Sequence, residues 1–383
     1  MMSQTNLRFF SAALFFLFVG CSEGFRSSAP NPSVQEEPKQ SPPETPPPVA
    51  QPEPQPQPTT PPLPEPGTPL SRICSKLDFR DVQWPSTMSD NEHMYLALAL
   101  NITGSFEGNL GWKNLAGDFD GQGISMGLMQ QNLGQGTLQP LWIETFQKDR
   151  SSLSQNLSSA QLLSMQRMLE SWLGQAIPAV SKSSVASEAI LEEELFPAGD
   201  SFNRLDIGYS ESDFQAQNAR NQASVSWARS EALDSRGQVR SAWRTPLQTI
   251  AETPFYRSLQ IQTSLKYFLR AQAYLKSFGY QQVRSLLLMY DFVVQNGSIG
   301  ESHLKIYNDW LQKNPSADEE QKTLALLEAR LTTVRPQYRN DVRARKTTII
   351  KGQGVVHQRQ RNLPREYCFS PLDLVVKKTE SLP

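Results

Sequence analysis

The stretch TGSFEGNLGWKNLAGDFDGQGISMGLMQQNLGQGTL, from Thr103 to Leu138, decides the fold that we expect for this chain. Its many glycines allow tight turns and a close approach of the backbone to a ligand. It carries three carboxylates, Glu107, Asp118 and Asp120, and a sequence typical of a helix precedes it. Carboxylates held on such turns are candidates for acid–base chemistry.

The sequence before this stretch predicts a helix that leads into it. Ser89 and Glu92 have the capping-box spacing that begins a helix, and the apolar run MYLALALNI continues it. We expect the helix to end at Thr103-Gly104, which places Glu107 just beyond its C-terminal end. An apolar wall disfavours the anionic form of a carboxyl group, which suits a general acid. The alternative is a surface glutamate in a loop.

The sequence after Glu107 predicts a hairpin. GDFDGQG (residues 117–123) is typical of a turn, and ISMGLMQ (residues 124–130) predicts a short strand. Such a hairpin would carry Asp118 or Asp120 across a groove from Glu107. The two aspartates point to opposite sides of an extended segment, so at most one of them faces the glutamate. Acidic residues also occur in turns for backbone reasons alone, and that alternative stays open.

Charge and ligand spacing exclude several classes of function. The net charge of −1 over 383 residues gives no basic footprint, so we expect no nucleic-acid partner. The three histidines are scattered, without metal-ligand spacing, so we expect neither a metal nor a cofactor. A hard cation bound by carboxylates alone is the alternative. Cys74 and Cys368 lie near the two ends of the globular part, and in an oxidising compartment they would pair. Two inert thiols are the alternative.

The N-terminal part predicts export. Arg8 and the apolar run FFSAALFFLFVG (residues 9–20) fit a signal peptide and are too short to span a membrane. The run ends at Cys21 in a sequence that resembles a bacterial lipobox, which implies lipidation of Cys21, and Ser22 after it resembles lipoproteins of the outer membrane. An ordinary signal peptide of a secreted protein is the alternative.

The domain organisation follows from composition. Residues 21–72 are rich in proline, which predicts an extended tether. No second linker follows, so we expect one domain over residues 73–375 and a flexible tail over 376–383. The whole would be a monomer, anchored by lipid in the cell envelope.

Two motifs of the opening stretch resemble known families. Phe106-Glu107 and DFDGQGISMG (residues 118–127) resemble the core of the chitosanase family in the lysozyme-like superfamily, where a helix-ending glutamate precedes a GDGxG turn. This resemblance assigns the second acid to Asp120. GLMQ (residues 127–130) is similar to a stretch of lytic transglycosylases, which act on peptidoglycan. Both imply an α+β, mostly α, lysozyme-like domain of two lobes with a small β-hairpin lining the substrate cleft.

Two later segments resemble the same family in the same order. LMYDFVVQNG (residues 288–297) is similar to its YDxxVxxG segment, and RNDVRARKTTIIKGQG (residues 339–354) to an arginine-bearing segment. The resemblance implies that Asp291 and Arg345 support the catalytic glutamate, with Arg339 and Arg343 as competing counterparts. For Asp291 the alternative is a residue on a helix face at the start of a loop. The chain also departs from the family. Glu107 and Asp120 are only 13 positions apart, and residues 149–240 match nothing, so we expect a variable helical lobe there.

The resemblance implies a glycoside hydrolase that cleaves β-1,4 bonds in a hexosamine polysaccharide, either peptidoglycan, including its deacetylated form, or chitosan. Glu107 would be the general acid and Asp120 the base, with Asp118 in reserve. The candidates for sugar binding are polar residues near the turn and aromatic residues: Gln122, Gln130, Asn132, Tyr290 and Trp112. Trp142 could also stack on a sugar ring, but we expect it to lie in the buried core. The alternatives are a lytic transglycosylase that uses Glu107 alone and a non-catalytic, cell-wall-binding lipoprotein.

Overall fold

The computed structural model describes residues 69–178 and 211–375. These residues are mostly helical, with a three-stranded and a two-stranded sheet, so the predicted α+β, mostly α class is confirmed at this level. The signal peptide, Cys21 and the tail fall outside the described residues, as does most of the tether. The last four residues of the predicted tether form the 3-10 helix η1 (Pro69–Arg72), because Leu70 packs against the core.

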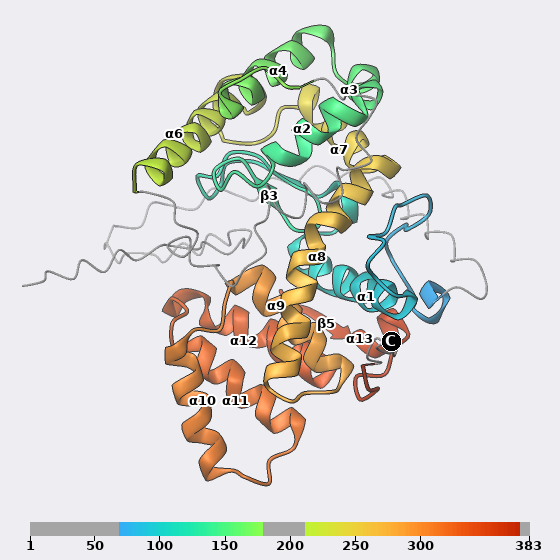
Figure 1. Ribbon diagram of the computed structural model, residues 1–383, viewed down its shortest axis with the longest axis vertical. Helices are drawn as coiled ribbons and strands as arrows, with labels where there is room; N and C mark the ends of the chain where they lie inside the picture. Colours follow the sequence, from blue (N-terminus) through green and yellow to red (C-terminus); the bar gives the residue numbers. More distant parts are fainter. Residues whose placement is uncertain (1–68, 179–210, 376–383) are drawn as a thin grey trace, which may run out of the picture.

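Two apolar clusters define two lobes, and helix α8 (Pro254–Ser277) belongs to both (Figure 1). Tyr256 and Leu259 near its start are buried in one cluster, and Ile261 and Phe268 further along are buried in the other. We call residues 115–178 and 211–259 the sheet lobe, and residues 69–114 and 260–375 the α9 lobe. A helix of 24 residues is about 36 Å long, so α8 can serve both lobes as a common strut.

The sheet lobe lies at the top of Figure 1. Its elements are β1 (Leu115–Ala116), β2 (Ser125–Met126), β3 (Gln131–Asn132), α2 (Gln139–Lys148), α3 (Arg150–Asn156), α4 (Ser159–Leu173), α6 (Glu211–Trp227), the π-helical segment η4 (Ala228–Ala232) and α7 (Ser241–Ala251). Helix α4 lies in the region where we expected a variable helical lobe. It begins at a Ser158–Gln161 capping box and ends at Gly174 in the left-handed conformation.

The α9 lobe lies below and contains the remaining elements (Figure 1). Besides η1, they are α1 (Asp90–Glu107), η2 (Gly111–Lys113), α9 (Val283–Asn296), α10 (Glu301–Lys313), α11 (Glu319–Leu331), α12 (Pro336–Lys351), β4 (Gln353–Val356), β5 (Arg359–Asn362) and α13 (Leu363–Tyr367). Strands β4 and β5 form an antiparallel hairpin.

The three-stranded sheet is antiparallel in the order β1–β2–β3, but its strands are shorter than predicted. Strand β2 covers only Ser125–Met126, and residues 127–130 form the turn to β3. The chain turns because Gly127 and Gln130 both have positive φ, at 85° and 49°. The prediction of one strand over residues 124–130 was therefore wrong, and Gln130 and Asn132 do not share a strand.

Helix α1 begins as predicted and ends later. The backbone N–H of Ser89 donates to Glu92 Oε2 at 2.8 Å, as a capping box requires. The helix continues through Gly104 to Glu107. A Cβ on Gly104 would lie 2.8 Å from Leu128 Cδ2, so this glycine allows the turn after β2 to approach the helix closely and does not end it.

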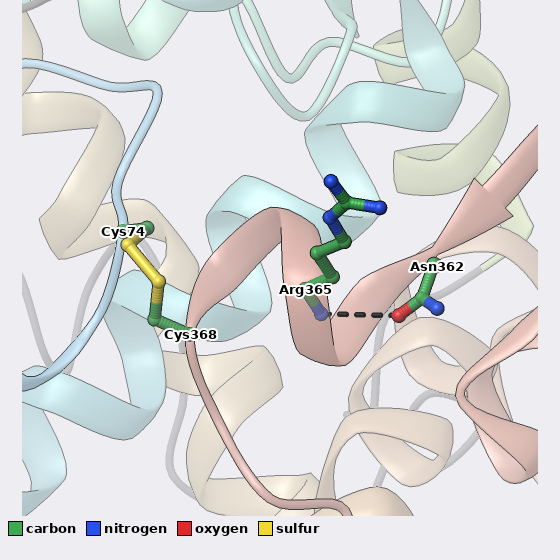
Figure 2. The surroundings of a disulfide bond; sticks show 4 residues. All are labelled: Cys74, Asn362, Arg365 and Cys368. Carbon is green, nitrogen blue, oxygen red and sulfur yellow. Dashed lines mark hydrogen bonds between the residues drawn. A yellow bond between two sulfur atoms is a disulfide. The ribbon is translucent and has the colours of Figure 1, made fainter.

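A disulfide joins Cys74 to Cys368, 294 positions apart, which confirms the predicted pairing (Figure 2). The backbone N–H of Cys74 also donates to Tyr367 O at 3.0 Å. Helix α13 is capped by Asn362, whose Oδ1 accepts from the Arg365 N–H at 3.1 Å (Figure 2). The two ends of the α9 lobe are therefore fixed to each other.

Over the described residues, no helix has both the length and the apolarity that a membrane span requires.

Candidate active site

Three segments that are far apart in the sequence meet at the end of α1. Arg345 on α12 donates from Nη1 to Glu107 Oε1 at 2.7 Å. The same guanidinium donates to Asp291 on α9, from Nε to Oδ2 at 3.0 Å and from Nη2 to Oδ1 at 2.6 Å. Arg345 therefore bridges the two carboxylates. The structure brings together the predicted acid and both residues predicted to support it.

This group is almost completely buried. The side chains of Asp291 and Arg345 are 0% and 2% exposed, and that of Glu107 is 10% exposed. Burial alone would raise the pKa of Asp291, but the charges of Arg345 and Lys346 outweigh it and hold that pKa below its usual range. Asp291 is therefore a permanent anion that fixes the Arg345 guanidinium beside Glu107.

Two residues of this group were not predicted from the sequence. The Lys346 ammonium donates to the Asp291 carboxylate, to the Asp291 backbone O at 3.0 Å and to Gln295 Oε1 at 2.7 Å. The Thr103 hydroxyl donates to Asp291 Oδ1 at 3.0 Å. Both have a signal in the sequence, since Lys346 follows Arg345 directly and Thr103 lies four positions, or one helical turn, before Glu107.

Asn114 holds the end of α1 in place. Its Oδ1 accepts from the backbone N–H of Leu110 at 2.9 Å, and its backbone O accepts from the N–H of Gly127 at 2.8 Å. A Cβ on Gly108 would lie 2.5 Å from Asn114 Oδ1, so glycine is required directly after Glu107. Asn114 thus ties the residues after Glu107 to the turn between β2 and β3.

Gln260 on α8 fixes the same turn from the other side. Its Oε1 accepts from the backbone N–H of Leu128 at 2.8 Å, and its side chain is fully buried. A buried amide that pairs with a backbone group strongly specifies position, because the unpaired alternative is costly. The GLMQ turn is therefore held by α1 and by α8 together.

Asp118 closes the turn between β1 and β2. Its Oδ1 accepts from the Gly123 N–H at 2.8 Å, and its Oδ2 pairs with Arg229 Nε at 2.5 Å. Its backbone N–H donates to Gly237 O at 2.9 Å. Both carboxylate oxygens are engaged, so Asp118 stabilises the turn.

Asp120 lies on the same turn in a different environment. Within the described residues, its carboxylate accepts hydrogen bonds only from backbone N–H groups of the turn, among them that of Gln122 at 3.1 Å. Burial raises the pKa of Asp120, and the nearby Asp118 adds to the effect. Among the described residues, Asp120 makes no hydrogen bond or ion pair with Glu107, Asp291 or Arg345.

The candidates for sugar binding are only in part accessible. Tyr290 is 0% exposed, and its hydroxyl donates to Met129 Sδ at 3.5 Å, so the prediction that it contacts sugar was wrong. The reason is that α9 is surrounded by the core over most of its length. Trp112 and Trp142 are also buried in the core.

The polar candidates divide in the same way. Asn132 is 7% exposed, and its Oδ1 accepts from the Gln135 N–H at 2.8 Å, so this amide shapes the loop after β3 and is not available as predicted. Gln122 and Gln130 are partly exposed. The Gln130 amide donates to Gly127 O at 2.8 Å, and its side-chain oxygen accepts no hydrogen bond from another described residue.

No metal-binding group of histidine, cysteine, aspartate and glutamate side chains occurs in residues 69–178 and 211–375. Two cavities lie away from Glu107: a groove of about 570 Å³ between α4 and α6, and one of about 330 Å³ beside the disulfide.

The chain was also compared with known proteins. Comparison with protein-family models, curated proteins and solved structures gives no match.

Proposed function

We propose that this chain is a glycoside hydrolase that cleaves β-1,4 bonds in a hexosamine polysaccharide, with Glu107 as general acid and Asp120 as base. One observation carries the proposal. Glu107, Asp291 and Arg345 come from three distant segments, and they form one buried, hydrogen-bonded group. Such a group is what the resemblance to chitosanases implies around the catalytic glutamate.

The chemistry needs a proton for the leaving oxygen and a carboxylate that activates water. Glu107 would supply this proton to the leaving oxygen, and Arg345 Nη1 donates a hydrogen bond to its Oε1 at 2.7 Å. The Asp291 anion neutralises Arg345 and takes most of the guanidinium hydrogen bonds, so it fixes the guanidinium beside Glu107. The raised pKa of Asp120 makes its carboxylate a stronger base for water.

Asp120 is a better candidate than Asp118 for the carboxylate that acts as base. Both oxygens of Asp118 are already held, one by the Gly123 N–H and one by Arg229. In the part of the chain that the structure describes, Asp120 has only backbone partners in its own turn. A carboxylate that positions water needs an oxygen free to accept from it.

The substrate that we propose is peptidoglycan, including its deacetylated form, or chitosan. The lipobox-like Cys21 and the proline-rich tether would place the domain in the bacterial envelope, anchored to the outer membrane and within reach of the cell wall. A tethered enzyme suits a polymer that cannot diffuse to it.

Mass spectrometry of fragments released from peptidoglycan, from its deacetylated form and from chitosan tests the proposal. We expect reducing ends from the wild type, and a loss of rate of about 10²–10⁴-fold in Glu107→Gln and in Asp120→Asn. Asp118→Asn is the matched control, and we expect a much smaller loss there, through a weaker turn.

Two outcomes would contradict the proposal. Full activity of Asp120→Asn with anhydro-sugar products would mean a lytic transglycosylase that uses Glu107 alone. A wild type that cleaves none of the three polymers but binds the cell wall tightly would mean a non-catalytic wall-binding protein.

A further inference from the structure

A groove of about 570 Å³ lies between α4 and α6, in the part of the sheet lobe for which the sequence shows no resemblance. Its volume is within the range of about 300–1,000 Å³ that is usual for ligand sites. The indoles of Trp172 and Trp227 line it, together with Arg167, Arg220 and Glu231. We call it the α4–α6 groove.

Helix α6 and η4 present two faces, and only one of them belongs to the groove. Arg220, Ser224, Trp227 and Glu231 line the groove, at spacings of four, three and four residues along one helical face. The other face points to the sheet, where Val225 is buried in the same cluster as Ile124 and Leu133. The sheet therefore supports the helix from behind, and the groove side faces α4.

The two indoles are fixed before any ligand arrives. The Trp172 Nε1–H donates to Asn221 Oδ1 at 2.8 Å, and the Trp227 Nε1–H donates to Ser164 Oγ at 2.9 Å. The Trp227 ring also packs edge-on against Trp142 and Trp243, with centroids 6.2 and 5.5 Å away. Rings held in this way lose little entropy on binding.

The charged side chains of the groove are not engaged elsewhere. Arg167, Arg220 and Glu231 make no side-chain hydrogen bond or ion pair with other described residues, and Arg167 and Arg220 are exposed. Two guanidiniums against one carboxylate give the groove a positive balance. Guanidinium groups bind carboxylates well because they can donate two parallel hydrogen bonds.

We propose that the α4–α6 groove binds a segment of a carboxylate-bearing glycan, the class to which peptidoglycan belongs. The C–H faces of sugar rings are apolar and pack on indoles, while their hydroxyls need polar partners such as the exposed Ser171 of the groove. The carboxylates of the glycan would pair with Arg167 and Arg220. Chitosan, a polycation, fits this charge poorly. The identity of the occupant rests on the proposed function.

The groove is coupled to the candidate active site through η4. Glu231 of η4 lines the groove, and Arg229 of the same π-helical segment pairs with Asp118 on the turn that carries Asp120. π-helical turns are frequent at functional sites. A glycan bound in the groove would thus be held by an element that also fixes the turn of the second acid.

Binding of soluble peptidoglycan strands to full-length Glu107→Gln protein, measured by calorimetry, tests this inference. Ala223 is exposed and lines the groove, so Ala223→Trp fills it without removing a contact. Gln222→Trp is the control, at an exposed neighbouring position outside the groove lining. We expect at least tenfold weaker binding for Ala223→Trp and unchanged binding for Gln222→Trp, with equal melting temperatures.

Charge reversal tests the carboxylate. Arg167→Glu with Arg220→Glu should weaken binding of peptidoglycan strands by at least tenfold and leave binding of chitosan oligomers no weaker. The inference is overturned if Ala223→Trp binds like Gln222→Trp, if charge reversal has no effect, or if wall peptides without sugar bind as tightly as the strands.

Failure of the hydrolase proposal and failure of the groove proposal give different experimental results. A wild type that does not cleave, but whose binding is weakened by Ala223→Trp, contradicts the hydrolase and leaves the groove as a glycan site. A wild type that cleaves peptidoglycan, and whose Ala223→Trp variant binds and cleaves normally, contradicts the groove alone.

Discussion

Asp291 is a buried anion whose partners are two buried cations, Arg345 and Lys346. Removing its charge leaves both cations in a medium that solvates them poorly. We therefore expect Asp291→Asn to lower the free energy of unfolding by about 3–5 kcal/mol, measured by denaturant titration. The control is Asp341→Asn, which breaks a partly exposed pair with His357 and should cost at most about 1 kcal/mol. Equal losses in the two variants would contradict this view of the buried group.

The residues of the candidate site differ in how well the sequence predicts them. Glu107, Asp291 and Arg345 could be named because their motifs follow the order of a known family. Asn114 and Gln260 could not, since each acts on backbone groups brought near only by the fold. Tyr290 was assigned wrongly because a tyrosine in a helical pattern does not reveal whether its helix is buried on one side or on nearly all.

At the scale of single elements, the hydrogen bond that caps the N-terminus of α10 depends on the protonation state of a histidine. The N–H of Gly300 donates to His303 Nδ1 at 3.0 Å, and His303 Nε2 lies 2.8 Å from Thr333 Oγ1. Burial, together with the nearby charge of Arg330, lowers the pKa of His303 to about 4. The neutral ring therefore caps α10, and a proton on Nδ1 would remove that hydrogen bond.

The sign of the pH effect follows from linkage. Between about pH 6.5, where an unfolded histidine titrates, and about pH 4, the unfolded chain binds a proton that the folded protein does not. His303 thus makes stability fall as pH falls through this window. We expect His303→Gln, which has no charge to gain, to show a shallower loss of unfolding free energy between pH 6.5 and 4. An identical slope in wild type and variant would contradict the assignment.

Helix boundaries are predicted less well where tertiary packing overrides the local sequence signal. The start of α1 was predicted correctly because the capping box is a local signal. Its end was predicted too early, since Gly104 looks like a breaker but serves close packing against Leu128. Helix α8 begins at Pro254 behind the Thr253 cap, and its first turns are buried in the sheet lobe and not in the α9 lobe.

On the scale of the whole molecule, the two proposed catalytic carboxylates come from different lobes. Glu107 ends a helix of the α9 lobe, and Asp120 lies on a turn of the sheet lobe. Helix α8 is buried in both lobes, and its Gln260 holds the turn between β2 and β3 that packs on α1. The placement of one acid relative to the other thus depends on α8 and on the contact of α1 with that turn.

The disulfide closes the α9 lobe, and its loss should be felt there. Cys74 and Cys368 are 294 positions apart, and a cross-link over a long loop contributes about 2–5 kcal/mol, in part by restricting the unfolded chain. The segment after Cys368 also caps α9, because the N–H groups of Val283 and Arg284 donate to backbone oxygens of Asp373 and Pro371. Releasing Cys368 should loosen this cap.

We therefore expect Cys74→Ser with Cys368→Ser to lower the melting temperature by roughly 5–15 °C. Amide exchange should become faster in residues 363–375 and at the start of α9, while α4 and α6 exchange as before, because their apolar cluster is separate. Reductant should lower the melting temperature of the wild type and leave the double variant unchanged. An increase in exchange that spreads evenly over both lobes would contradict this view, because it would mean that the lobes unfold as one unit.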